Sequence, residues 1–234
     1  MRISENVYQL TGHVTGLNSN TFVIDTEEGL VLVDTGYREY YLESMKRMLS
    51  FWGLDQKKVV AVFITHGHFD HCGNAHVFEE KNIPIYASKD DADAISSGGR
   101  RVMEDVFGTK FTPCHHITSL EDGEKFTFGQ TAVTAVSLPG HTKGSMGFLM
   151  EHMGTKVLFV GDLFMVAGAS PADDLEVEIG YMGSVDFNKE ANLDSLRRLT
   201  EMDADVVAPG HRGVFYGNSK MLFRKVYETA FALS

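Results

Sequence analysis

The segment with the highest density of chemically versatile side chains is Thr65–His71, which reads THGHFDH. It holds three histidines and one aspartate within six residues, in the pattern H-x-H-x-D-H. Imidazole nitrogen and carboxylate oxygen bind borderline-soft divalent ions such as zinc, at about 2.0–2.2 Å. With this composition, a chance match to the pattern is expected in roughly one chain in a thousand. The segment therefore predicts a metal site.

An apolar run directly before the motif explains its spacing. Val59–Ile64 has the composition and length of a buried strand. Side chains two positions apart point the same way in extended backbone, so His66 and His68 can reach one ion together. Asp70 and His71 follow where the chain turns into an expected helix, and they can face a second ion.

Three further candidate ligands follow later strands. His141 lies in PGHT, Asp162 in VGD and His211 in PGH, each just after an apolar run. Together with the motif they make five histidines and two aspartates at strand ends. This set is sufficient for two ions and one bridging carboxylate.

The elements that must position these side chains are short apolar strands alternating with amphipathic helices. Runs rich in Val, Ile and Phe, bounded by turn residues, predict strands, and apolar residues at steps of three or four predict helices. The expected strands are Thr21–Ile24, Leu30–Val33, Val59–Ile64, Ile83–Ala87, Ala132–Leu138, Val157–Val160 and Val206–Ala208. The expected helices are Glu39–Gly53, Lys189–Met202 and a last helix that begins near Asn218 or Ser219.

Composition limits the class of protein. The 234 residues include 21 Lys and Arg against 32 Asp and Glu, a formal net charge of −11. Proteins that bind the phosphate backbone of a nucleic acid need a basic surface, so no nucleic-acid partner is expected. The start, MRISENVYQL, lacks the apolar region of a secretory signal, and no apolar run approaches the roughly 20 residues of a membrane span. We expect a single domain over residues 1–234, in the cytoplasm, with a small-molecule substrate and no membrane partner.

The motif series resembles the metallo-β-lactamase-fold superfamily of hydrolases. H-x-H-x-D-H, PGHT, GD and PGH occur in that order, preceded by Val33-Asp34-Thr35-Gly36. The resemblance extends from about Val7 to His211. It implies an α/β fold, a four-layer αβ/βα sandwich with a dinuclear site at one edge between the two sheets.

The resemblance also implies roles for single residues. It assigns His66, His68 and His141 to a first ion, and Asp70, His71 and His211 to a second, with Asp162 bridging both. Asp34 would accept a hydrogen bond from a ligand histidine and orient it. Asp70 is also a candidate proton donor to the leaving group, so Asp70 and Asp34 are the expected catalytic residues beside the metal ligands.

The chemistry expected from such a site is metal-assisted hydrolysis. Two divalent ions can hold a bridging hydroxide at neutral pH, and the expected substrate is a small ester-like molecule, a thioester or a lactone. The ions are expected to be zinc, with iron or manganese as alternatives, since all three accept N and O ligands. Position 162 is Asp, whereas zinc β-lactamases of this family with a cysteine ligand carry Cys there, so penicillin hydrolysis is not expected.

Two other activities stay open at this point. One is a mononuclear iron persulfide dioxygenase, whose ligands would be His66, His141 and Asp162. The other is a phosphodiester hydrolase, which would need a cationic pocket.

Several residues could shape the pocket. Arg100 or Arg101 could bind a substrate carboxylate or phosphate, with solvated surface arginines as the alternative. The acidic segment 165–186 predicts either a lid or a homodimer contact, and His13 could touch substrate. Candidates for an apolar wall in that segment are Met165, Tyr181 and Met182.

Overall fold

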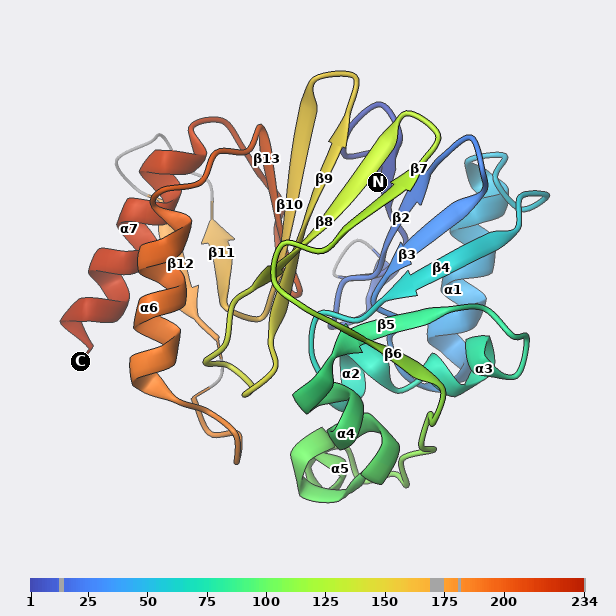
Figure 1. Cartoon of the computed structure of the whole chain (residues 1–234), viewed down its shortest axis with the longest axis horizontal. Coiled ribbons are helices and arrows are strands. Elements are labelled where there is room, and N and C mark those ends of the chain that lie inside the picture. The colour runs from blue at the N-terminus through green and yellow to red at the C-terminus, as the bar shows by residue number, and fades with distance from the viewer. Residues whose placement is uncertain (13–14, 169–174, 181, 234) are drawn as a thin grey trace.

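Two six-stranded sheets lie face to face (Figure 1). The computed structural model describes residues 1–12, 15–168, 175–180 and 182–233. The first sheet has the order β1 (Val7–Gln9), β2 (Phe22–Asp25), β3 (Leu30–Val33), β4 (Val59–Phe63), β5 (Ile85–Ser88) and β6 (Ile117–Leu120). The second has the order β14 (Phe215–Tyr216), β13 (Val206–Pro209), β10 (Thr155–Gly161), β9 (Met146–His152), β8 (Thr131–Ser137) and β7 (Lys125–Phe128).

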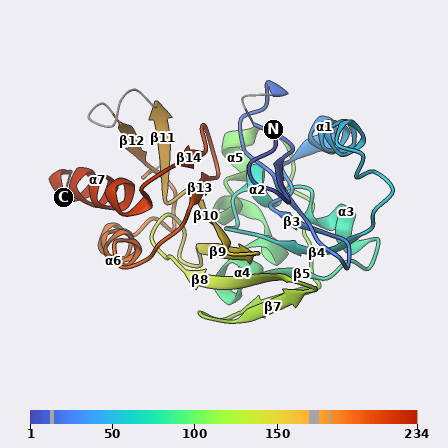
Figure 2. The same ribbon diagram turned by 90° about the horizontal axis from the view of Figure 1, so that it is seen from above.

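Helices cover the outer face of each sheet (Figures 1 and 2). The first sheet carries α1 (Arg38–Phe51), α2 (Phe69–Cys72), α3 (Ala75–Glu79) and α4 (Lys89–Ser97). The second carries α6 (Lys189–Leu199) and α7 (Ser219–Ala232). Two smaller units lie outside the sheets and these helices. One is the pair η2 (Gly99–Val102) and α5 (Glu104–Phe107), and the other is the hairpin of β11 (Phe164–Gly168) and β12 (Glu176–Ile179).

Period-two alternation in the strands produces the layers. In β3, Leu30 and Leu32 join the apolar cluster under α1 to α4, whereas Val31 and Val33 join the cluster between the sheets. In β10, Val157 and Phe159 face the first sheet, and Leu158 packs with α6 and α7. Because these strands are apolar on both faces, they are buried between a helix layer and the other sheet. The result is the four-layer αβ/βα sandwich that the sequence predicts.

The strand directions bring the candidate ligands to one edge. β3 and β4 are parallel, as are β10 and β13. β8 and β10 are both antiparallel to β9, so they run the same way. The carboxyl ends of these strands carry the candidate residues: Asp34 after β3, the H-x-H-x-D-H motif after β4, His141 after β8, Asp162 after β10 and His211 after β13.

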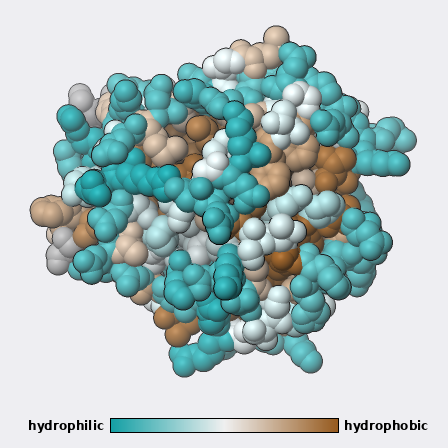
Figure 3. Space-filling model, viewed as in Figure 1, coloured by the Kyte–Doolittle hydropathy of each residue, from teal (hydrophilic) through white to brown (hydrophobic). Residues whose placement is uncertain are grey.

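The surface agrees with the composition. The face in Figure 3 is mainly hydrophilic, with hydrophobic patches of limited extent. Within the described ranges, we find no helix with the length and apolar character needed to cross a bilayer.

Candidate metal centre

All seven candidate ligands come together at this edge. Each is buried, with between 0% and 9% of its surface exposed. Their donor atoms form three overlapping groups, within each of which the donor atoms lie no more than 4.8 Å apart. We call His66, His68 and His141 the neutral triad, and Asp70, His71 and His211 the carboxylate triad.

The neutral triad consists of imidazoles that stay uncharged. His68 Nδ1 lies 2.9 Å from His141 Nε2. Burial lowers the pKa of His68 to about 3 and lowers the pKa values of His66 and His141 as well. Neutral rings keep the lone pair that a metal ion needs.

The carboxylate triad has the opposite electrostatics. His211 Nε2 lies 3.2 Å from Asp70 Oδ2 and 3.2 Å from His71 Nε2. Burial would lower the pKa of His211, but the carboxylates of Asp162 and Asp70 raise it to about 10. The pKa of His71 is likewise raised well above its usual value, because the nearby carboxylates outweigh burial. Without an ion, the carboxylates therefore favour the protonated form of these two rings.

Asp162 lies between the triads. Its carboxylate oxygens are 3.0 Å from His211 Nε2, 3.4 Å from His71 Nε2 and 3.8 Å from His141 Nε2. Burial opposes its charge, but His211 and His71 hold the pKa of Asp162 well below its ordinary range. An ionised carboxylate in this position can contact ions in both triads.

The donor set fits two metal ions. Among the described residues, His66 Nε2 and Asp162 Oδ1 are buried side-chain atoms without a hydrogen-bond partner, a condition that costs about 1–3 kcal/mol per atom unless a cation or water binds there. Donor pairs at 2.9 and 3.2 Å are close to the roughly 3.3 Å that separates ligands of one tetrahedral ion with 2.0–2.1 Å bonds. Imidazole and carboxylate donors suit zinc, iron or manganese.

Asp34 holds two of the rings in place. Its Oδ2 accepts hydrogen bonds from His71 Nδ1 at 2.8 Å and from the Thr65 hydroxyl at 2.8 Å. The Thr65 oxygen lies 3.0 Å from His66 Nδ1 and can accept its N–H, because the hydroxyl proton points to Asp34. Asp34 thus orients His71 directly and His66 through Thr65, which leaves Nε2 of each ring for the centre. Thr65 stands beside the motif, but no sequence pattern signalled this relay.

Backbone strain gathers around the centre. Six described non-glycine residues have positive φ angles, and three of them are at the site: Asp34 at 63°, Met103 at 60° and Arg212 at 62°. Such conformations persist only where the surroundings impose them, and they concentrate at functional sites.

Asp91 of α4 joins the two loops of the neutral triad and was not predicted from the sequence. Its Oδ2 accepts a hydrogen bond from the Thr142 hydroxyl at 2.7 Å, directly after His141. Its Oδ1 lies beside Gly67, between His66 and His68, where a Cβ on that glycine would be 3.5 Å away. Burial raises the pKa of Asp91 to about 6. Because nothing in the sequence pairs Asp91 with Thr142, only the packing of α4 reveals this contact.

A cleft of about 520 Å³ opens onto the cluster. It is lined by five of the candidate ligands, His68, His141, Asp70, Asp162 and His211. Its apolar lining comes from the η2–α5 unit, with Met103, Val106 and Phe107, and from Met165 of β11. Its other polar residues are Asn18, Glu178 and Arg212; Glu178 of β12 is the cross-strand partner of Met165 and pairs with Arg212 at 2.7 Å.

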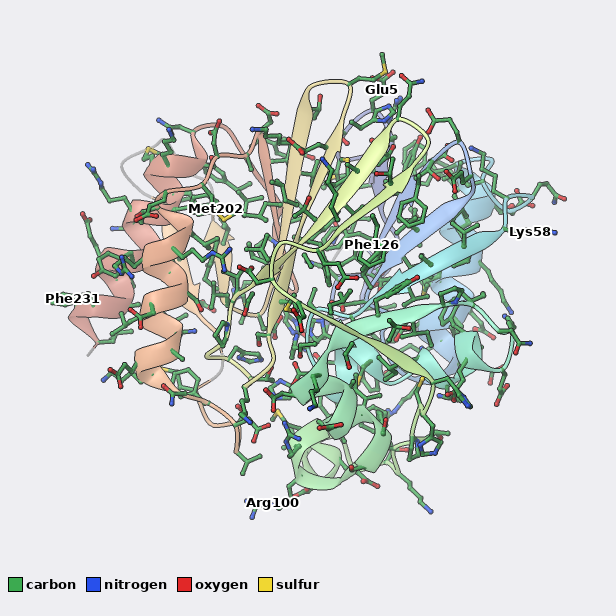
Figure 4. The ribbon with its side chains drawn as sticks, in the orientation of Figure 1. Glu5, Lys58, Arg100, Phe126, Met202 and Phe231 are labelled. Carbon is green, nitrogen blue, oxygen red and sulfur yellow. The ribbon has the colours of Figure 1, made fainter. Side chains whose placement is uncertain are left out.

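The other residues singled out from the sequence have different positions. Arg101 is bound to Asp186 at 2.7 Å and to the Asp90 carbonyl at 3.1 Å, and it does not line the cleft. Figure 4 shows Arg100 at the outer end of the η2–α5 unit, directed away from the protein. Met182 is 52% exposed and is not part of the cleft wall. His13 and Tyr181 lie outside the described residues, as does 169–174 of the segment 165–186.

The αβ/βα sandwich and the His- and Asp-rich cluster at its edge together define a class of metal-binding proteins. The chain belongs to the metallo-beta-lactamase superfamily, whose family model matches residues 14–211.

Two curated relatives illustrate the similarity. An uncharacterized protein of Mycobacterium leprae is 29% identical over 218 residues, 86% of this chain and 90% of that protein. The atrochrysone carboxyl ACP thioesterase of Aspergillus fumigatus is 26% identical over 197 residues, 84% of this chain and 51% of that protein. The chain therefore spans about half the length of the thioesterase.

Solved structures support the fold. A metallo-β-lactamase of Cronobacter sakazakii superposes with a TM-score of 0.76 at 16% identity, covering 100% of this chain and 95% of that one. A protein crystallised in a di-iron-bound form superposes with a TM-score of 0.63 at 25% identity, covering 85% of this chain and 89% of that one.

Proposed function

We propose that this protein is a dinuclear metal-dependent hydrolase that cleaves a small ester-like substrate, a thioester or a lactone. The observation that carries the proposal is the pair of complete donor triads with Asp162 between them. A mononuclear dioxygenase would need only one such group. Membership of a superfamily rich in metallohydrolases and the similarity to a thioesterase agree with hydrolysis.

Each part of the reaction can be related to residues of this chain. Bound divalent ions would supply a nucleophile from water near neutral pH and polarise the substrate carbonyl. The seven candidate ligands would hold those ions, and Asp34 keeps His71 and His66 in position. Asp70 lines the cleft, and its Oδ2 is a candidate site for the proton that the leaving group takes up.

The cleft supports an ester-like substrate over a phosphodiester. Arg212 is the only Lys or Arg among the described residues that line it, and Glu178 pairs with Arg212 at 2.7 Å. A phosphodiester would therefore meet no unpaired cation of the protein. We also propose a small-molecule substrate and a cytoplasmic location, while a homodimer stays a prediction.

The first test is elemental metal analysis of protein purified without added metal or chelator, followed by screening of esters, thioesters and lactones. We expect about two ions per chain, zinc first, with iron as the main alternative in view of the di-iron-bound neighbour. About one iron per chain, with oxygen uptake on a persulfide, would overturn the proposal in favour of the dioxygenase.

The variant Asp162→Ala tests the bridging position. Losing a group shared by both ions should lower metal content and reduce kcat/KM by on the order of 10³-fold, since metal ions supply several kcal/mol of transition-state stabilisation. The control is Asp194→Ala on α6, an exposed aspartate whose ion partner Arg197 is 3.8 Å away. Unchanged metal content and rate in Asp162→Ala would refute the assignment.

A further inference from the structure

We propose that the wall formed by Met103, Val106 and Phe107 binds a hydrocarbon chain of the substrate, so that the enzyme prefers esters or thioesters with medium-length apolar acyl groups. This inference rests on the proposed function and adds the substrate class. We call these three residues the acyl wall. They line the same cleft as five of the candidate metal ligands.

The acyl wall contains one strongly exposed apolar residue and two half-buried ones, Met103 and Phe107. Val106 is 68% exposed although it belongs to a helical turn beside the buried centre. Exposed apolar residues scattered singly need no explanation, but several that share one cleft indicate a binding surface. Met165 of β11 also lines the cleft, beside Glu178 of β12, and flexible methionines adapt to chains of different shape.

The acyl wall is held against the metal-ligand loop. The Phe107 ring lies 5.6 Å from Phe69, between His68 and Asp70 in the chain, and 5.0 Å from Tyr37. The Glu104 carboxylate accepts hydrogen bonds from the backbone N–H groups of Gly99 at 3.2 Å and Phe111 at 3.1 Å. The wall is therefore formed before substrate arrives, which reduces the cost of ordering on binding.

The polar residues of the cleft give the substrate its direction. Asn18, Glu178 and Arg212 line the same cleft as the acyl wall but belong to other segments of the chain, and the Glu178–Arg212 ion pair neutralises both charges. A hydrocarbon chain placed there would cover charged groups, whereas on the acyl wall it removes apolar surface from water. The reactive carbonyl then lies over the ligands, with the chain toward Val106.

The experiment measures hydrolysis of p-nitrophenyl acetate, butyrate, hexanoate and octanoate by the metal-loaded protein. Full burial of a methylene is worth a factor of about four, and an open wall buries less, so kcat/KM should rise about twofold per methylene. Val106→Ser should reduce kcat/KM for the octanoate several-fold more than for the acetate. Met153→Ser, which changes a 71% exposed side chain in the β9–β10 turn, is the matched control and should leave both values unchanged.

Binding provides a second readout that does not depend on turnover. Titration calorimetry with acetate, hexanoate and octanoate should give affinities that rise with chain length in the wild type and in Met153→Ser, with a smaller rise in Val106→Ser. Ester hydrolysis with no dependence on chain length in rate or affinity would overturn the acyl wall while the hydrolase stands. No hydrolysis of any ester, thioester or lactone by protein with two ions would overturn both.

Discussion

The neutral triad and the carboxylate triad share one buried cluster, yet they differ in charge before any ion binds. The pKa values of His66, His68 and His141 are lowered, so these rings are uncharged at neutral pH. The carboxylate triad contains an anion, and its rings His71 and His211 hold protons because their pKa values are raised. In the neutral triad an ion would bind to imidazole lone pairs that are already free. In the carboxylate triad it would have to displace protons from the rings.

The two triads also differ in what supports them. Asp91 packs on the loops that carry the neutral triad, beside Thr142 and Gly67. The carboxylate triad is tied to Asp34 through His71, and His211 Nδ1 lies 3.1 Å from the Asn18 carbonyl. A substitution can therefore be chosen to disturb one triad more than the other, which makes the comparison testable.

The largest effect should come from removing one ligand of each triad. His68→Ala and His211→Ala should each lose one ion and reduce kcat/KM by about 10²–10⁴-fold, because each ion contributes several kcal/mol. Metal analysis and initial rates check this result. Two ions retained in either variant would contradict its ligand assignment.

Proton release in the same experiment separates the triads. The raised pKa of His211, about 10, means that this ring is protonated at pH 7.5 and must lose its proton to bind metal. His68, with a pKa of about 3, is already neutral at this pH and releases no proton when it binds metal. Calorimetry at pH 7.5 in buffers of different ionisation enthalpy should therefore show at least one proton fewer in His211→Ala than in His68→Ala. Equal release would contradict the charge difference.

A smaller effect, felt in both triads, should come from Asp34→Asn. The amide keeps the shape of the side chain but weakens its hydrogen bond to His71 and, through Thr65, the positioning of His66. Groups that orient metal ligands typically contribute 10–100-fold in metal affinity or activity. Competition with a chelator should show weaker binding of both ions. Weaker binding of the ion in one triad alone would contradict the relay through Thr65.

The part of the fold and site that the sequence predicts depends on local patterns. The seven expected strands are all present, and Asn218 caps the last helix by accepting a hydrogen bond from the Met221 N–H at 3.2 Å. The ligand positions at strand ends follow from the spacing within each motif and the apolar run before it. The turn into a helix at Asp70 and His71 was expected and is α2. Strand β9 was not predicted, and neither were the polar-faced edge strands β6 and β7 or the helices α3 to α5.

The features missed depend on contacts between distant segments. The sequence indicates Arg100 and Arg101 as candidates because cations can bind a carboxylate or phosphate, whereas Val106 and Phe107 in the same stretch line the cleft. Which face of that stretch meets the site is decided by the packing of Phe107 on Tyr37 and Phe69. No periodicity in a segment of this length can reveal that choice.

The smallest effect, and the most selective, should come from Asp91→Asn. Asp91 accepts one hydrogen bond from Thr142 and contacts Gly67, but it touches no residue of the carboxylate triad in the contacts described above. The amide oxygen of Asn can still accept the Thr142 hydroxyl, but the bond loses its charge. A hydrogen bond to a charged group is worth about 1.5–3 kcal/mol and a neutral one about 1 kcal/mol, and only part of the difference should reach the ion, so we expect the ion in the neutral triad to bind several-fold more weakly. Thr142→Val removes the bond altogether, together with the contact to the Ser145 hydroxyl at 2.7 Å, and should weaken the same ion at least as much. Because the proton release belongs to His71 and His211, both variants should keep the wild-type value. A changed proton count would show that the two triads respond as one unit, and their electrostatic difference would then not make them independent.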